Sequence, residues 1–284
     1  IPVEADTGLA AHLKRTTPAS ADPKSVNWWK NNPKYVVSLL KAWWGEHATA
    51  ANDFAFHNLP KIGRGFQGQG YHWMALFEAM YAGQIKGLVC LGQNPAVCGP
   101  NANLARKALE NLDWLVSVDL FETESASFWR RPGADPAKIR TEVFLLPAAS
   151  SVEKEGSLTN SGRWVQWRSA AVPPTGEAKS DLWILDRLCK TLKAEYAKGG
   201  SFPDPILKLR WDYGLEPDAH RVAKEINGTF LADVTVEDGR QFKAGTQVPG
   251  FAVLRDDGST ASGNWSYAGM YPEAGNMTAR RGKK

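Results

Sequence analysis

Polar residues that could hold a nucleotide follow three short apolar runs of the sequence. Gln93 and Asn94 come after the first run, Val118 and Asp119 end the second, and Lys154 follows the third. Side-chain amides carry both donors and an acceptor, so they can pair with the edge of a base or a pterin. A carboxylate can accept from a ribose hydroxyl or a guanine amino group, and a lysine can neutralise a phosphate. Together these residue types predict a crevice for a nucleotide-type cofactor.

Each of these residues also has an ordinary structural interpretation. Asn94-Pro95 is typical of a turn, Asp119 of a cap at a strand end, and Lys154, between two glutamates, of a solvated run of charges. The sequence has no GxGxxG motif after the first apolar run and no GxxxxGK[ST] loop, which argues against standard NAD and ATP sites. It has no HExxH or GxSxG motif either, so zinc-protease and α/β-hydrolase chemistry are not indicated.

The composition argues against several other classes of protein. The chain has 284 residues, 43% of them hydrophobic and 23% charged, which is typical of one large or two ordinary globular domains. Its 34 basic and 30 acidic residues give a net charge of only +4, so we expect no nucleic-acid partner. No apolar run approaches the ~20 residues that a membrane span needs. The three cysteines form no CxxC pair, so no metal site or iron–sulfur cluster is predicted in this chain.

The elements that must position these residues alternate between strands and helices. The apolar runs at 85–91, 114–120 and 142–146 are expected to be buried strands. Apolar residues at helical spacing predict helices at 33–44, at 71–82, after a cap at Asn101, and at 182–196. Such alternation predicts an α/β fold with a doubly wound, mainly parallel, Rossmann-like sheet flanked by helices. Ligands of such sheets bind beyond the carboxyl ends of the strands, where the polar residues lie.

Three regions are expected along the chain. Residues 1–32 are polar and predict an irregular segment, residues 33–200 the α/β domain, and residues 201–284 a small C-terminal α+β extension. In the extension a helix is expected at 217–227, and Asp238-Gly239 and Asp257-Gly258 are signals of β-hairpins. The sequence begins without a Met and ends in a basic run, and we expect it to be a piece of a larger protein.

The residues around the strand ends resemble those of molybdopterin oxidoreductases, and most of all the large subunits of the formate dehydrogenase-N type. The most specific stretch is Glu153-Lys154-Glu155-Gly156-Ser157-Leu158-Thr159-Asn160, followed by Arg163 and Val165-Gln166-Trp167-Arg168. Further similarity lies within 85–101, 112–129, 141–149 and 257–281. The resemblance extends from about residue 54 to the end of the chain.

The resemblance implies a bis-molybdopterin guanine dinucleotide cofactor that carries molybdenum or tungsten, with residues 33–200 binding one dinucleotide. It implies cofactor contacts at the six positions that match those of similar enzymes, namely Gln93, Asn94, Val118, Asp119, Lys154 and Asp181. The last of these is a residue that the pattern alone would make only a helix cap.

The resemblance also implies that the complete protein oxidises formate to carbon dioxide. Similar enzymes have an iron–sulfur cluster held by four cysteines and a cysteine or selenocysteine on the metal, and neither has a match here. We therefore expect this chain by itself to lack formate dehydrogenase activity and to hold no catalytic residue. The implied partners are the rest of the same large subunit, an iron–sulfur beta subunit and a membrane cytochrome, in the periplasm.

Two alternatives remain open at this point. The first is another molybdopterin oxidoreductase, such as a nitrate reductase-like enzyme. The second is a non-catalytic, tryptophan-rich module that binds its ligand through exposed indoles and the glycine-rich loop at 63–70.

Overall fold

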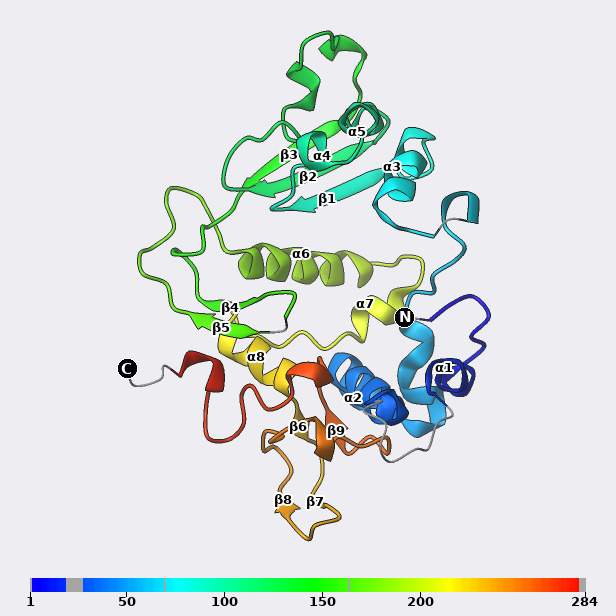
Figure 1. Ribbon diagram of the computed structural model, residues 1–284, viewed down its shortest axis with the longest axis vertical. Coiled ribbons are helices and arrows are strands. Elements are labelled where there is room, and N and C mark those ends of the chain that lie inside the picture. The colour runs from blue at the N-terminus through cyan, green and yellow to red at the C-terminus, as the bar shows by residue number, and fades with distance from the viewer. Residues whose placement is uncertain (1, 19–27, 69, 163, 281–284) are drawn as a thin grey trace. The chain divides into compact units, whose positions relative to one another are not determined.

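The computed structural model describes residues 2–18, 28–68, 70–162 and 164–280 (Figure 1). Arg163 and Arg281, which contribute to the resemblance, lie outside the described residues. The chain forms two compact units that interleave in sequence: unit 1 comprises 1–61, 155–169 and 185–284, and unit 2 comprises 62–154 and 170–184. Neither of the boundaries expected from the sequence, after residue 32 and after residue 200, coincides with a boundary between these units.

Unit 2 contains a parallel sheet. Strands β1 (Gly87–Leu91), β2 (Trp114–Asp119) and β3 (Glu142–Pro147) pair in the order β1-β2-β3, and both pairings are parallel. The register sets Leu91 beside Val118. These strands coincide with the three predicted apolar runs, and the α/β fold class is confirmed. The expected burial of the strands is wrong for β3, where only Val143 is not exposed. Alternate side chains of a strand point to opposite faces, and the apolar cluster with Leu115 and Val143 covers one face, while Val89 and Phe144 are exposed. Strand order does not reverse within these three strands, so the position of a ligand has to be argued from the strand ends themselves.

Helices α3 (Trp73–Tyr81), α4 (Pro95–Cys98) and α5 (Ala102–Leu109) accompany this sheet (Figure 1). Met80 of α3 and Leu109 of α5 are fully buried and share one apolar cluster with Leu115 of β2 and Phe128. The predicted cap is confirmed, because the Asn101 side chain accepts the Leu104 N–H at 3.0 Å. Short 3-10 turns occupy Phe66–Gly68, Phe128–Arg130 and Pro136–Lys138.

Unit 1 combines helices with short antiparallel strand pairs. Its helices are α1 (Leu9–Thr16), α2 (Asn32–Trp44), α7 (Pro203–Leu207) and α8 (Ala219–Asn227), and the long helix α6 (Asp181–Tyr196) has its first turn in unit 2 and the rest in unit 1. The strand pairs are β4 (Gly156–Thr159) with β5 (Val165–Arg168), β6 (Thr229–Phe230) with β9 (Thr260–Ala261), and β7 (Val234–Thr235) with β8 (Gln241–Phe242). Short 3-10 turns occupy Trp28–Asn31, Gly45–His47, Ala50–Asn58, Phe251–Val253, Trp265–Tyr267 and Met277–Ala279. Within the described stretches, no helix has the length and apolarity to cross a bilayer.

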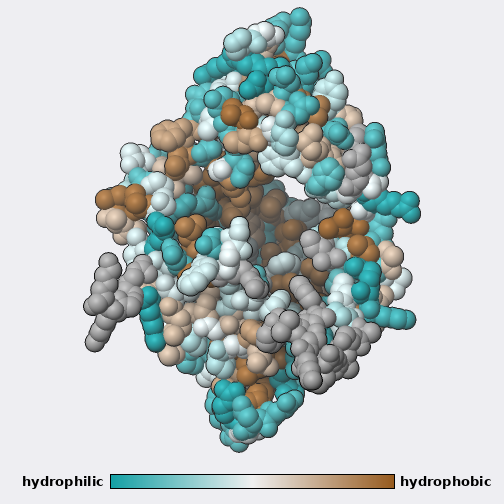
Figure 2. All heavy atoms as spheres, viewed as in Figure 1, coloured by the Kyte–Doolittle hydropathy of each residue, from teal (hydrophilic) through white to brown (hydrophobic). Residues whose placement is uncertain are grey.

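Two hairpin predictions have different outcomes. The turn at Asp238-Gly239 is confirmed, since it joins β7 to β8. This hairpin carries the ion pairs Asp238–Arg240 and Asp233–Lys243, at 2.7 and 2.6 Å, and hydrophilic side chains cover it at the lower end of the view in Figure 2. The turn at Asp257-Gly258 leads into β9, which pairs with β6, while the preceding apolar run forms the 3-10 turn Phe251–Val253. Which strand β9 pairs with depends on long-range packing, and a local turn signal does not predict that partner.

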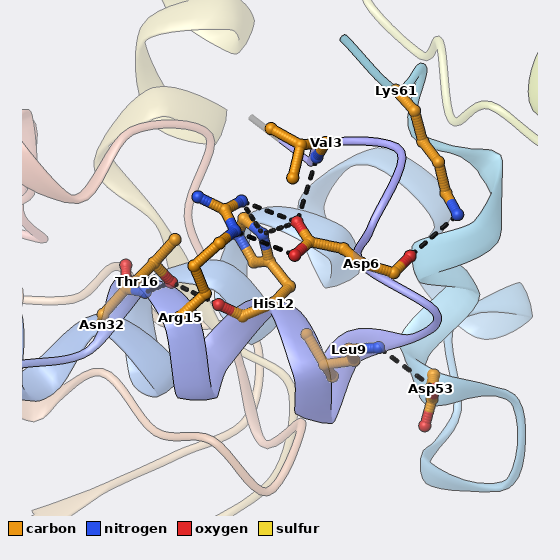
Figure 3. A network of polar contacts seen from close by, with 9 residues as sticks. All are labelled: Val3, Asp6, Leu9, His12, Arg15, Thr16, Asn32, Asp53 and Lys61. Atoms are coloured by element: carbon orange, nitrogen blue, oxygen red, sulfur yellow. Dashed lines mark hydrogen bonds and ion pairs between the residues drawn. The ribbon is translucent and has the colours of Figure 1, made fainter. Parts of the chain in front are cut away.

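The N-terminal segment, expected to be irregular, contains the helix α1. A buried ionic network holds this helix in place (Figure 3). Asp6 is only 2% exposed, and its carboxylate contacts His12 Nδ1 at 2.9 Å and accepts from Arg15 Nε at 2.9 Å and from the Val3 N–H at 3.0 Å. An eight-residue helix is too short to form by propensity alone, so these tertiary contacts stabilise it.

Candidate functional site

The carboxyl ends of β1, β2 and β3 form one continuous edge of unit 2. The backbone ladder continues past the strands, because the Gly92 N–H donates to the Val118 oxygen at 2.9 Å and the Ala148 N–H to the Asp119 oxygen at 3.0 Å. On the other side of β3, Lys179 pairs with Ala148 in parallel. Since neighbouring segments of a sheet lie about 4.8 Å apart, these four segments span roughly 14 Å. This length suits an extended ligand that lies across the strand ends.

All of the predicted cofactor contacts belong to unit 2, and each lies at or after the carboxyl end of a segment that forms this edge. The loop after β1 carries two of them, the end of β2 carries two, and the two segments beyond β3 carry one each; they are Gln93, Asn94, Val118, Asp119, Lys154 and Asp181. Residues that are far apart in sequence thus follow neighbouring segments at the same edge of the sheet.

Gln93 and Asp119 keep polar atoms available at the edge. Gln93 is exposed, and its amide has no hydrogen bond within the described part of the chain. Asp119 accepts the Leu120 N–H through Oδ1 at 2.8 Å, which leaves Oδ2 without a donor among the same residues. Gly92, at φ 59°, has open space where a Cβ would lie, so a ligand can approach the backbone there. Val118 differs, because its side chain is 1% exposed and can act only through packing and its backbone.

The Asn94 amide is committed to the protein itself. Its Nδ2 donates to Glu124 at 2.6 Å, and its Oδ1 accepts from the Ser125 N–H at 3.1 Å and from the Ser125 hydroxyl at 2.7 Å. The hydrogen bond from Asn94 holds the pKa of Glu124 below its ordinary value. Ser125 is fully buried and accepts the Ala96 N–H at 3.0 Å. Asn94 therefore joins the loop after β1 to the loop after β2 and fixes the position of its neighbour Gln93.

Replacing Asn94 by alanine is expected to lower the free energy of unfolding by about 2 kcal/mol, because the buried Ser125 loses the acceptor of both its donors. The midpoint of thermal unfolding should then fall by roughly 4–8 °C. Glu124→Gln is the matched control: it keeps an acceptor for Asn94 Nδ2 and should change the stability by less than about 0.5 kcal/mol. Equal unfolding midpoints for Asn94→Ala and the parent would contradict the role given to this residue.

Lys154 and Asp181 form an ion pair between the two segments beyond β3. Asp181 begins α6, where a carboxylate is favoured by the helix dipole. The Lys154 side chain is 30% exposed and that of Asp181 is 41% exposed, so solvent and ligand can reach the pair. Lys154 is thus not a freely solvated residue of a charge run but a positioned cation at the sheet edge.

Glu153 is a residue that the sequence analysis missed. Its carboxylate accepts the Ser150 N–H at 2.8 Å and the Thr175 hydroxyl at 2.9 Å, and these bonds hold its pKa below the ordinary value. Glu153 thus fixes the turn that precedes Lys154 and joins this turn to the segment that leads to α6. The sequence Ser150-x-x-Glu153 has the spacing of a capping box, and this signal could have identified the residue.

The three cysteines differ in their surroundings. Cys90, on β1, is buried. Its burial, and to a smaller extent the negative charge of Asp119, raise the pKa of its thiol to about 11, so it stays a neutral thiol. Cys98 is exposed and Cys189 half-buried, so the three cysteines are not uniformly core residues. Among the described residues, no group of three or more His, Cys, Asp or Glu side chains is arranged to hold a metal ion.

Comparison with known proteins gives a consistent family. A model of the molybdopterin oxidoreductase family matches residues 62–191. The chain is 46% identical over 283 residues to formate dehydrogenase 2 subunit alpha (cytochrome c-553) of Nitratidesulfovibrio vulgaris, covering 99% of this chain and 27% of that protein. It is 40% identical over 290 residues to the formate dehydrogenase-O major subunit of Escherichia coli, covering 99% of this chain and 28% of that subunit.

A nitrate-reducing relative is matched over a shorter stretch. The assimilatory nitrate reductase catalytic subunit of Bacillus subtilis is 40% identical over 136 residues, covering 48% of this chain and 17% of that protein. The chain spans little more than a quarter of the length of the two formate dehydrogenase subunits.

Proposed function

We propose that the carboxyl edge of β1–β3 binds one half of a bis-molybdopterin guanine dinucleotide cofactor, because residues 62–191 match the model of the molybdopterin oxidoreductase family. The observation that carries the proposal is the gathering of all the predicted contact residues on this one edge of unit 2.

The chemistry of the edge fits the parts of such a cofactor. Lys154 supplies a positive charge for a phosphate. The free Oδ2 of Asp119 can accept from a guanine amino group or a ribose hydroxyl, and the Gln93 amide can pair with a ring edge. The bound cofactor supplies the metal and the redox-active pterin, while this chain holds and orients it. Asn94 fixes the loop after β1, and Glu153 fixes the loop after β3, so that both loops are held in place for contact with the cofactor.

We propose that the complete protein is a formate dehydrogenase large subunit, which converts formate to carbon dioxide with release of one proton and two electrons. The coverage of the relatives supports this over a nitrate reductase-like activity. The formate dehydrogenase subunits align over 99% of the chain, whereas the nitrate reductase aligns over 48%. The metal would be molybdenum or tungsten, and an iron–sulfur cluster would lie elsewhere in the large subunit.

The proposed partners are the rest of the large subunit, an iron–sulfur beta subunit and a membrane cytochrome, in a periplasmic, membrane-associated complex. This chain by itself is proposed to be inactive toward formate. Formate-dependent reduction of a viologen dye by the isolated chain would contradict that proposal.

The nucleotide site is tested by titrating the chain with GDP and ADP in a calorimeter. We expect saturable binding of GDP and, for Asp119→Ala, an affinity for GDP about tenfold lower, because a hydrogen bond to a charged group is lost. If Asp119 contacts the base, ADP binds more weakly than GDP to the parent. If it contacts the ribose, the Asp119→Ala substitution lowers the affinity for GDP and for ADP by the same factor.

Asp113→Ala is the matched control, since Asp113 is exposed, carries the same charge and precedes β2 at the opposite edge of the sheet. It should leave the affinity for GDP unchanged. Absence of saturable GDP binding, or equal losses in the two variants, would overturn the proposed site.

A further inference from the structure

A cavity of about 290 Å³ lies in unit 1. It is lined by Ala42 of α2, by residues of the 210–213 segment and of α8, and by three later residues, all outside the stretch matched by the family model. Its charged and acidic lining groups are Arg210, Asp212, Tyr213, Arg221, Lys224 and Glu225. The proposed cofactor site uses none of them.

Two acidic groups of the cavity lining contact each other. The Tyr213 hydroxyl donates to Glu225 Oε2 at 2.8 Å, and Tyr213 is only 8% exposed. Burial raises the pKa of Glu225 and also that of Tyr213, and in Tyr213 the neighbouring charge of Glu225 adds to the effect. The pKa of Glu225 is raised although the charge of Arg210 acts to lower it.

Positive charge exceeds negative charge around the rest of the cavity. Arg210 is fixed by its backbone N–H, which donates to the Trp43 oxygen at 2.6 Å, and its guanidinium has no ion-pair partner within the described stretches. Arg221 meets Asp212 at 3.5 Å, a long and exposed pair. Lys224 Nζ lies 5.5 Å from the ring centroid of Tyr271 and makes no ion pair with the described residues. Three cations thus surround a space that also holds the exposed carboxylate of Asp212 and the half-buried carboxyl group of Glu225.

We propose that this cavity binds a phosphate-type oxyanion, held by Arg210, Arg221 and Lys224 above the Tyr213–Glu225 pair. Guanidinium groups present paired N–H donors that match two oxygens of a tetrahedral anion. The small volume suits an anion or the phosphate of a small metabolite better than a large organic ligand. The inference is independent of the proposed cofactor site.

Calorimetric titration of the 284-residue chain with inorganic phosphate, at constant ionic strength, tests the site. We expect saturable binding, and Arg210→Gln should lower the affinity about tenfold, since charge-assisted hydrogen bonds are lost. Arg240→Gln is the matched control, because it removes the same charge from the β7–β8 hairpin and lines no part of the cavity. Thermal unfolding of each variant verifies that it is folded, and Arg221→Gln serves in place of Arg210→Gln if that variant does not fold.

Glu225→Gln gives a second readout, because glutamine keeps the shape of the side chain and cannot ionise. This variant is expected to bind phosphate at least as tightly as the parent. A parallel titration with glycerol 3-phosphate separates the two sources of the anion: tighter binding indicates a phosphorylated metabolite, and weaker binding indicates free phosphate. No saturable heat with either ligand, or equal affinities for the parent and Arg210→Gln, would overturn the proposal.

Discussion

Lys154→Glu is expected to lower the affinity of the chain for GDP about 100-fold, the largest effect on binding among the variants considered. Two causes act together. The substitution removes the cation that we propose meets a phosphate, and it sets a carboxylate beside Asp181, so that two negative charges face the ligand. Each of these costs roughly a factor of ten. Calorimetric titration with GDP at low and moderate salt measures the effect, which should shrink as salt screens the charges.

The control for this prediction is Lys138→Glu, which makes the same change of charge in unit 2. Lys138 is well exposed and precedes β3, at the amino edge of the sheet, so its replacement should leave GDP binding within about twofold of the parent. The double variant Lys154→Glu/Asp181→Lys restores an ion pair of opposite orientation. It should recover stability but only part of the affinity. Full recovery of affinity in the double variant, or no loss in the single one, would show that Lys154 serves only the fold.

Asp6→Asn is expected to lower the midpoint of thermal unfolding by roughly 10 °C, the largest effect on stability. The buried carboxylate is the common partner of His12, Arg15 and the Val3 N–H, and an asparagine would turn N–H groups toward donors (Figure 3). Differential scanning calorimetry at pH 7 measures the change. Glu4→Gln removes an equal charge from an exposed position two residues earlier and should shift the midpoint by no more than about 1 °C.

The pH dependence of this effect has a definite sign. The hydrogen bonds from Arg15 hold the pKa of Asp6 far below its ordinary value. A carboxylate with a lowered pKa stabilises the fold fully above the unfolded value, near 3.9, and progressively less as the pH falls below it. The difference in midpoint between the parent and Asp6→Asn should therefore be constant from about pH 5 to 8 and shrink below pH 4. A difference that grows toward acid would contradict the role of the buried carboxylate.

The sequence by itself determined the parallel sheet and the edge where the candidate site lies. The apolar runs that become β1, β2 and β3 are continuous, and this pattern predicts strands. Their expected burial on both faces does not hold, since most of β3 is exposed. The helix α3 precedes β1, and α4 and α5 separate β1 from β2, whereas only 3-10 turns lie between β2 and β3. Parallel strands place their carboxyl ends at one edge whatever the details of packing. For that reason the polar residues at those ends could be assigned to one site before any coordinates.

Only the tertiary structure decided what each polar side chain does there. Asn94 looked like a ligand for a ring edge, yet its amide is used by Glu124 and Ser125, some thirty residues away. Glu153 looked like part of a solvated run, yet it binds Thr175 across a long loop. A side chain's hydrogen-bond partners depend on which distant segments pack against it, and the local sequence does not determine that packing.

The same reason explains the elements that the sequence did not predict. The helix α1 is short and depends on Asp6, and the hairpin β4–β5 depends on its own cross-strand pairing in unit 1. The cavity between Arg210 and α8 likewise exists only because segments from different parts of the chain pack together. Periodicity and strand-end chemistry are local properties that a sequence displays directly, whereas burial, charge pairing and cavities arise only from the folded chain.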